Sequence, residues 1–282
     1  MQATSPWRDL FEESYKPMNL RGCSPLTPGG HLAAINGLEA YWRSLEAGRP
    51  GKTLRIGDVS ETLIAKYLDH LLVVKRRRRA THNKHLRHLT AQWNWALSEG
   101  LVPRKLRLTQ IKEEERDPDC WSQEEFTRLL FVAAELRGYI GDVPACYWWP
   151  ALILMVYSTG VRIDAIMRIR SADLDLEQRV VRVQAETQKD KAEQRFTLLP
   201  DVCGVLGRIR PERLPCVFDD WPLDRTAKAR ARNGWDALRR AFRKLLAKAE
   251  LPTTSRDLWH KLRRTFATEV TLSSGLKVAQ AL

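Results

Sequence analysis

The sequence of 282 residues lacks several features that mark whole classes of protein. Its longest apolar run, ALILMVY at 151–157, is far shorter than the roughly 20 residues that span a bilayer. The first residues have no apolar segment typical of a signal peptide. Five scattered cysteines include no Cys-x-x-Cys pair, which argues against a disulfide framework and a zinc site. We therefore expect a cytoplasmic protein with reduced thiols and no membrane partner.

Acidic residues are scarce relative to basic ones. The chain has 47 Lys and Arg against 34 Asp and Glu, a formal net charge of +13 and a pI near 9.8. Such an excess favours a polyanionic partner, most often nucleic acid. The excess is clustered, in KRRRR at 75–79 and in the segment 225–264, which has thirteen basic residues and three acidic ones. This clustering favours a binding surface over the alternative, a generally basic exterior.

Helical periodicity dominates the first 110 residues. Residues 1–29 hold Pro, Gly and Ser without a period, and we expect an N-terminal arm of poor order there. Apolar spacings of three and four then predict helices over 32–47, 60–74 and 80–100. The last of these should end at Gly100. Residues 30–110 are therefore predicted to form a helical domain.

A second domain is predicted after a charged linker at 111–121. Ser122 and Glu125 have the spacing of a capping box and open a helix. The segments VVRVQ at 180–184 and RFTLL at 195–199 alternate around a polar stretch, which predicts an antiparallel hairpin. The rest of 122–282 has helical spacing, so the fold class is mainly α with a small antiparallel sheet.

Three features of this second domain suit phosphate binding. Arg162 follows a glycine at a predicted helix start, where backbone N–H groups and a guanidinium favour anions. Lys189 and Lys191 lie at the predicted hairpin tip. His260 and Arg263 are three residues apart in DLWHKLRRTFATEV at 257–270, on one side of a helix and beside its apolar stripe. Each feature alone is also common on protein surfaces.

The order of these motifs resembles the tyrosine recombinase, or phage integrase, family. The segments that carry the resemblance are TGVR at 159–162, a lysine hairpin, and HKLRRTFAT at 260–268. Upstream, THNKHLRHLTAQWNWALSEGLVP at 81–103 is similar to the family's helical, SAM-like core-binding domain. The resemblance covers about residues 30–282. It implies a core-binding domain over 30–110 and a mainly helical catalytic domain over 122–282.

The resemblance also implies roles for single residues. Members of the family attack a DNA phosphate with a tyrosine and form a 3′-phosphotyrosine. Arg162 and Arg263 would stabilise charge on the phosphate oxygens, and His260 would bind the same phosphate and assist proton movement. Lys189, with Lys191 as the alternative, would protonate the leaving 5′ oxygen. No ATP, metal or other cofactor is implied.

Duplex DNA is the implied partner, bound by a homotetramer in the family. The exposed basic residues expected to contact DNA phosphates are Arg76, Arg77, Arg78, Arg79, Lys84, Arg87 and Arg264. Localisation with the nucleoid would follow.

Two positions depart from the family pattern. Ala165 stands where members often have an acidic residue, and the neighbouring Asp164 should point elsewhere on the helix. More seriously, all six tyrosines precede Arg162, and the last, Tyr157, lies in the apolar run and is predicted to be core. We therefore expect a C-terminally truncated member without its nucleophile, inactive in cleavage. The alternatives are a non-catalytic DNA-binding relic or regulator derived from an integrase, or a basic helical nucleic-acid binder with chance motifs.

Overall fold

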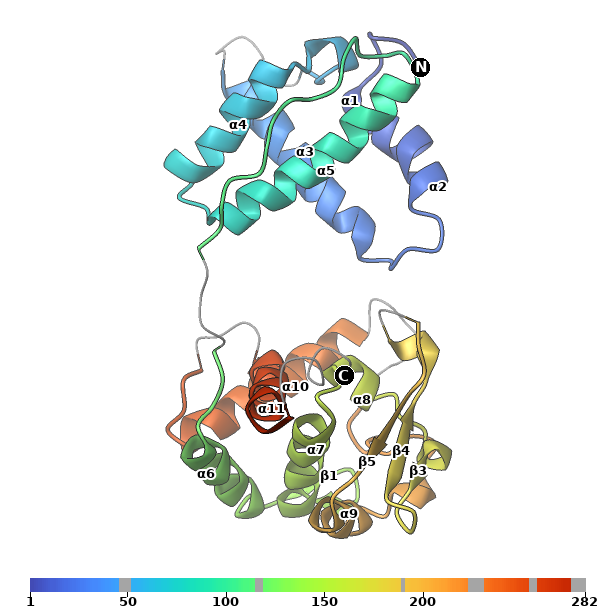
Figure 1. Ribbon diagram of the computed structural model, residues 1–282, viewed down its shortest axis with the longest axis vertical. Helices are drawn as coiled ribbons and strands as arrows, with labels where there is room; N and C mark the ends of the chain where they lie inside the picture. Colours follow the sequence, from blue (N-terminus) through green and yellow to red (C-terminus); the bar gives the residue numbers. More distant parts are fainter. Residues whose placement is uncertain (46–51, 115–118, 189–190, 223–230, 254–257, 275–282) are drawn as a thin grey trace. The chain divides into compact units, whose positions relative to one another are not determined.

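The computed structural model describes residues 1–45, 52–114, 119–188, 191–222, 231–253 and 258–274 (Figure 1). The chain divides into two compact units, unit 1 from Met1 to Arg116 and unit 2 from Asp117 to Leu282. Each unit encloses its own hydrophobic core. Within the described ranges, no helix is both long and apolar enough to cross a membrane.

Unit 1 is helical throughout its regular structure. Its elements are α1 (Trp7–Asp9), the π-helix η1 (Leu10–Tyr15), α2 (Lys16–Asn19), α3 (Thr27–Ser44), the 3-10 helix η2 (Ile56–Asp58), α4 (Glu61–Val73) and α5 (Arg79–Ser98). Helix α3 packs against α4 and α5, and α4 also packs against α5 (Figure 1).

The three helices predicted in unit 1 are confirmed, with shifted ends. Ser60 caps α4 by accepting a hydrogen bond from the Leu63 N–H at 3.1 Å. Helix α5 stops before Gly100, whose φ of 69° only glycine adopts without strain. Helix α3 begins five residues earlier than predicted, because Pro28 fits the first turn of a helix.

The expectation of an N-terminal arm is wrong. The side chains of Trp7, Leu10 and Phe11 are fully buried in the core of unit 1. The Trp7 indole Nε1 donates to the Gln92 Oε1 at 2.9 Å, and its backbone N–H donates to the Leu54 carbonyl at 2.9 Å. These residues, with Tyr15, are spaced by three, one and four, which is helical spacing hidden among Pro, Ser and Gly. Burial of this apolar face holds the segment in place.

Unit 2 surrounds a buried central helix with further helices and a small sheet. Its helices are α6 (Gln123–Ala134), α7 (Ala145–Thr159), α8 (Ile163–Ile166), α9 (Pro200–Gly207), α10 (Ala231–Lys248) and α11 (Leu258–Ser274), with 3-10 turns η3 (Ser171–Asp173), η4 (Ala185–Thr187) and η5 (Pro211–Arg213). Its strands are β1 (Tyr139–Ile140), β2 (Val143–Pro144), β3 (Leu174–Asp175), β4 (Val180–Val183) and β5 (Gln194–Thr197). Helix α7 packs against α6, α9 and α11.

The predicted hairpin and capping box are both present. Strands β4 and β5 pair antiparallel, with Val183 opposite Gln194, and β3 adds a third strand beside β4 that the sequence pattern did not predict. The Ser122 hydroxyl accepts from the Glu125 N–H at 3.2 Å, while the Glu125 carboxylate accepts from the Ser122 N–H at 2.9 Å. This reciprocal pair fixes the start of α6.

The charged segment 111–121 connects the two units. At one end, the Ile111 N–H donates to the Asn83 Oδ1 at 3.0 Å, which ties the segment to α5 of unit 1. At the other end, the buried Trp121 donates its backbone N–H to the Thr265 Oγ1 at 3.0 Å in unit 2. Both ends are therefore anchored in the unit that they adjoin.

Candidate active site and nucleic-acid interface

Arg162 lies at a sharp change of chain direction between α7 and α8. Helix α7 ends at Thr159 and is followed by Gly160, whose φ of 62° is left-handed and favours glycine. Arg162 then occupies the N-cap position of α8, and its carbonyl accepts from the Ala165 N–H at 2.9 Å and the Ile166 N–H at 3.0 Å. The side chain is half-buried, and among the described residues it forms no ion pair.

Helix α11 carries the second basic group. Leu258, Trp259 and Leu262 are buried, as the apolar stripe predicted. His260 is exposed and Arg263 is half-buried, so both lie beside the stripe rather than within the core. Phe266 and Val270, which continue the predicted stripe, are half-buried.

The seam where α7 contacts α11 involves residues close in sequence to Arg162 and Arg263. A Cβ atom at Gly160 would lie 2.4 Å from Cδ1 of Phe266, so the Phe266 ring is seated directly on this glycine. Gly160 is two residues before Arg162, and Phe266 is three residues after Arg263. Any side chain at 160 would force the Phe266 ring, or α11 with it, to shift. The glycine of TGVR therefore sets the separation of the elements that carry Arg162 and Arg263.

A second contact along the same seam involves Tyr157. Its hydroxyl donates a hydrogen bond to the Glu269 carboxylate, and its ring stacks on Phe126 with centroids 3.9 Å apart. Burial, followed by the Glu269 carboxylate, raises the pKa of the Tyr157 phenol. The phenol is therefore protonated at neutral pH and packs against the core of unit 2, in agreement with its prediction as a core residue. No local pattern in the sequence indicates the Tyr157–Glu269 or Gly160–Phe266 contacts, because both depend on how α7 meets α11.

The start of α11 is fixed from a third direction. The mostly buried Lys261 Nζ forms an ion pair with the Asp119 carboxylate at 2.8 Å and lies 5.7 Å from the centre of the Trp121 ring. The Thr265 hydroxyl, which accepts from Trp121, donates to the Lys261 carbonyl at 2.9 Å. These contacts hold the turn of α11 that presents His260.

The lysine of the hairpin stays a prediction. Lys189 lies outside the described residues. Lys191 is exposed, with a left-handed φ of 54°, and its N–H donates to the Gln188 carbonyl at 3.4 Å. The buried Gln188 side chain donates to the Gln194 Oε1 at 3.1 Å, which closes the loop onto β5.

The acidic position of the family pattern is structurally apolar here. Ala165 is 1% exposed and packs into the core of unit 2. The carboxylate of the exposed Asp164 forms an ion pair with Arg168 at 3.3 Å, one helical turn further on. The Asp164 carboxylate therefore pairs with Arg168 at the surface and does not take the core-facing position of Ala165.

The basic residues predicted in unit 1 are exposed. After α4 the backbone turns back, with the Lys75 N–H donating to the His70 carbonyl at 2.9 Å and the Arg77 N–H to the Leu71 carbonyl at 2.8 Å. These bonds close around Arg76, which has a left-handed φ of 47°. The exposed cations of this turn and of α5 are Arg76, Arg77, Arg78, Arg79, Lys84 and Arg87. Arg264 belongs to α11 in unit 2 and is half-buried.

The fold defines the class of protein. The described helices and small sheets match a Tn1549 transposon integrase solved with a circular intermediate DNA, at 16% identity and a TM-score of 0.68, covering 98% of this chain and 90% of that one. A lambda integrase tetramer solved on a Holliday junction matches at 15% identity and a TM-score of 0.69, covering 99% of this chain and 76% of that one. The chain thus has the fold of DNA integrases.

The sequence comparisons identify the family. Residues 123–282 match the model of the phage integrase family, and the chain belongs to that family. A putative tyrosine recombinase XerC of Pseudomonas aeruginosa is 24% identical over 234 residues, 74% of this chain. A tyrosine recombinase XerD of Ralstonia nicotianae is 30% identical over 162 residues, 53% of this chain. The matches cover 54% and 48% of those relatives, so this chain spans about half of their length.

Proposed function

We propose that this chain binds duplex DNA and acts in site-specific recombination, with unit 2 holding the reacting phosphate. In this proposal residues 30–110 are the core-binding domain and 122–282 the catalytic domain. The observation that supports it is the seam between α7 and α11, where Phe266 of α11 packs on Gly160. Gly160 is two residues before the half-buried Arg162, and Phe266 is three residues after the half-buried Arg263. Relatives named as tyrosine recombinases, and integrases solved on DNA, support the same reading.

The chemistry follows from the charge that develops at phosphorus. In the transition state of transesterification, negative charge grows on the two non-bridging oxygens, and two preorganised guanidiniums oppose it. His260, exposed beside Arg263, would donate to the same phosphate. A hairpin lysine, Lys189 or Lys191, would give its proton to the departing 5′ oxygen. The phosphodiester bond energy is stored in the covalent intermediate, so no nucleotide cofactor enters the proposal.

The attacking phenol is the one part these residues do not supply in a suitable place. The Tyr157 hydroxyl donates a hydrogen bond to Glu269 and its ring is stacked on Phe126, and no tyrosine follows it in the 282 residues. We propose that these residues form the phosphate-binding clamp and do not form a covalent adduct with DNA by themselves. We also propose assembly as a tetramer on DNA, as in the lambda integrase structure.

A substrate with an activated leaving group tests the clamp without a tyrosine. The duplex is first selected from a random pool by binding to the chain. It is then prepared as two adjoining strands, one ending in a 3′-p-nitrophenyl phosphate and the other beginning with a 5′-hydroxyl. The hydroxyl attacks phosphorus, the P–O bond to nitrophenol breaks, and p-nitrophenolate leaves while the hydroxyl proton passes to solvent.

We expect the chain to accelerate release of nitrophenolate and joining of the strands. Arg162→Ala or Arg263→Ala should lower that rate by about 10²–10³-fold, as loss of an oxyanion donor does, while DNA affinity changes little because one phosphate contact is a small share of the total. Arg168→Ala, which removes an exposed arginine on the same segment as Arg162, is the matched control. Tight DNA binding without any acceleration would instead favour the second candidate, a non-catalytic DNA-binding regulator.

A further inference from the structure

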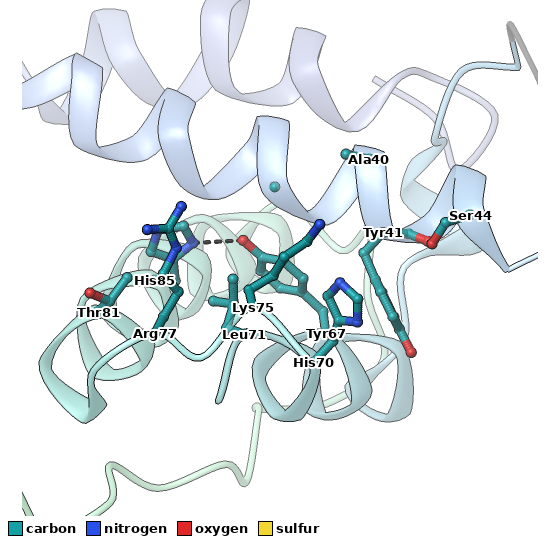
Figure 2. A pocket seen from close by; sticks show the side chains of 11 residues that line it. Ala40, Tyr41, Ser44, Tyr67, His70, Leu71, Lys75, Arg77, Thr81 and His85 are labelled. Carbon is teal, nitrogen blue, oxygen red and sulfur yellow. Dashed lines mark hydrogen bonds between the residues drawn. The ribbon is translucent and has the colours of Figure 1, made fainter. Parts of the chain in front are cut away.

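A cavity of about 520 Å³ opens in unit 1. Its walls come from α3, from α4 and the turn after it, and from the first turns of α5 (Figure 2). We call it the α3–α4 pocket. It is lined by Gly37, Ala40, Tyr41, Ser44, Tyr67, His70, Leu71, Lys75, Arg77, Thr81 and His85. A volume of this size is typical of sites for small organic ligands.

Aromatic rings form one wall of the α3–α4 pocket. Tyr41 lies with its ring centre 5.0 Å from that of His70 and 5.9 Å from that of Tyr67. At the base, the hydroxyl of Tyr67 and Nδ1 of His85 are hydrogen-bonded at 2.7 Å. Burial lowers the pKa of His85 below its usual range, so the ring is neutral, Tyr67 donates to Nδ1, and Nε2 carries the ring proton.

The shape of the pocket depends on small residues of α3. A Cβ atom at Gly37 would lie 1.9 Å from the Tyr67 hydroxyl oxygen, so the missing side chain at 37 makes room for Tyr67. Ala40, one turn along the same helix, is exposed at the opening. Gly37 therefore leaves space for Tyr67, and Ala40 leaves the opening clear.

Two cations complete the pocket. Figure 2 shows the side chains of Lys75 and Arg77 reaching from the turn after α4 toward α3. Their backbone positions are fixed by the hydrogen bonds to His70 and Leu71 described above. Of the described residues that line the pocket, none is acidic. The wall is thus aromatic and the rim is positive.

This combination selects one chemical class of ligand. Flat rings of Tyr and His stack on any base without reading its sequence, and Lys and Arg at a rim bind phosphate oxygens. An inorganic anion would not need the aromatic wall, and an apolar molecule would not need the cations. We propose that the α3–α4 pocket binds a single nucleotide, with the base against Tyr41 and His70 and the phosphate at Lys75 and Arg77.

The nucleotide has two possible sources with the same chemistry, a free mononucleotide or an unstacked nucleotide of bound DNA. The proposal does not rest on phosphoryl transfer at Arg162 and Arg263, because binding at this pocket is measured separately. Calorimetry on the full chain compares deoxyadenosine monophosphate with deoxyadenosine and with inorganic phosphate. We expect the mononucleotide to bind about tenfold more tightly than either fragment, or better, since each fragment loses one set of contacts.

Variants at the opening locate the binding. Ala40→Leu fills the opening from an exposed helix position and should weaken binding of the mononucleotide about tenfold. The double variant Lys75→Gln, Arg77→Gln should weaken it by a similar factor. Ala33→Leu, the same change at an exposed position of α3 that does not line the pocket, is the control for the first. Lys66→Gln, at an exposed position of α4, is the control for the second. Both controls should bind as the parent chain does.

Paired DNA substrates separate the two sources. If the source is DNA, a duplex with one unpaired nucleotide binds more tightly than the fully paired duplex, and Ala40→Leu removes the difference. If the source is a free nucleotide, the two duplexes bind equally and the mononucleotide still binds. The proposal is overturned if the mononucleotide does not bind at millimolar concentration and the duplexes are equal. It is overturned equally if inorganic phosphate binds as tightly as the mononucleotide, or if Ala33→Leu weakens binding as much as Ala40→Leu.

Discussion

The two units bury different chemistry. Between α3 and α5, unit 1 buries polar side chains that interact with one another. The centre of the His31 ring lies 4.2 Å from that of the His88 ring, and Nδ1 of His31 lies within hydrogen-bond distance, 3.2 Å, of the Gln92 side-chain amide. Unit 2 instead packs large apolar rings around α7, namely Trp148, Trp149, Trp221, Phe242 and Trp259. Unit 1 should therefore respond to protonation, whereas unit 2 should respond to the loss of apolar volume.

The largest expected effect comes from opening the aromatic core of unit 2. Trp259 lies with its ring centre 3.9 Å from that of Phe242 and stacks parallel to Trp149. Trp259→Ala should lower the free energy of unfolding of unit 2 by about 3–5 kcal/mol, because it removes buried apolar area and leaves a cavity. Urea unfolding gives the loss of stability, and hydrogen exchange measured separately for the amides of each unit shows which unit loses it. Phe131→Ala, an exposed ring on α6, is the control and should have little effect. An equal loss in unit 1 would contradict independent cores.

A smaller effect is expected at the seam between α7 and α11. Tyr157→Phe keeps the ring stacked on Phe126 but removes the hydrogen bond to Glu269, and should cost about 1 kcal/mol of the stability of unit 2. If, as we propose, the same seam positions Arg162 and Arg263, the rate of nitrophenolate release should also fall. Tyr139→Phe, at an exposed tyrosine, should change neither quantity. If Tyr157→Phe leaves both unchanged, the contact does not position the arginines.

The sequence predicts those structural features that depend on a local pattern of residues. The capping box at Ser122, the stripe of α11 and the hairpin of β4 and β5 each follow from spacings within a few residues. The charge clusters likewise located the exposed turn at Arg76–Arg79. Membership of the phage integrase family could also be inferred, because TGVR and His-x-x-Arg are short and fixed in order.

Contacts between residues far apart in the sequence could not be predicted from local patterns. The helical spacing of Trp7, Leu10 and Phe11 covers little more than one turn and is flanked by Ser and Pro, so the local pattern predicts an arm. The packing of Phe266 on Gly160 joins residues more than a hundred positions apart, and no local period encodes it. The α3–α4 pocket depends on Gly37, which in a linear reading is only a weak helix former. Such features need the fold before they have a meaning.

Protonation tests the polar interior of unit 1. Burial lowers the pKa of His31 and His85, and burial with the neighbouring His31 lowers that of His88 from 6.5 to about 4. The unfolded chain therefore binds more protons than the folded chain between these values. The stability that this contributes is fully present above about pH 6.5, and it is lost as the pH falls toward 4.

Thermal unfolding measured from pH 7 to pH 4 should show the transition of unit 1 falling in this window. His88→Gln removes the group with the largest shift, so the pH dependence of the variant should be shallower for unit 1 and unaltered for unit 2. Lys84 and Arg87, whose charges also lower the pKa of His88, stay in place in the variant. Identical pH profiles for the variant and the parent chain would exclude His88 as the responsible group.

The smallest effects are expected from single surface cations, and they separate binding from chemistry. Lys84 and Arg87 are exposed on α5, where a phosphate contact releases one condensed counterion. Lys84→Gln or Arg87→Gln should therefore reduce the slope of log affinity against log salt by about 0.9 each, across all duplex sequences. Nitrophenolate release from saturated complexes should be unchanged, since neither residue belongs to the α7–α11 seam. Lys66→Gln, an exposed lysine of α4, should leave the slope as it is. A slope that Lys84→Gln and Arg87→Gln leave unchanged would remove this face of α5 from the DNA interface and leave the turn at Arg76–Arg79 as the contact of unit 1.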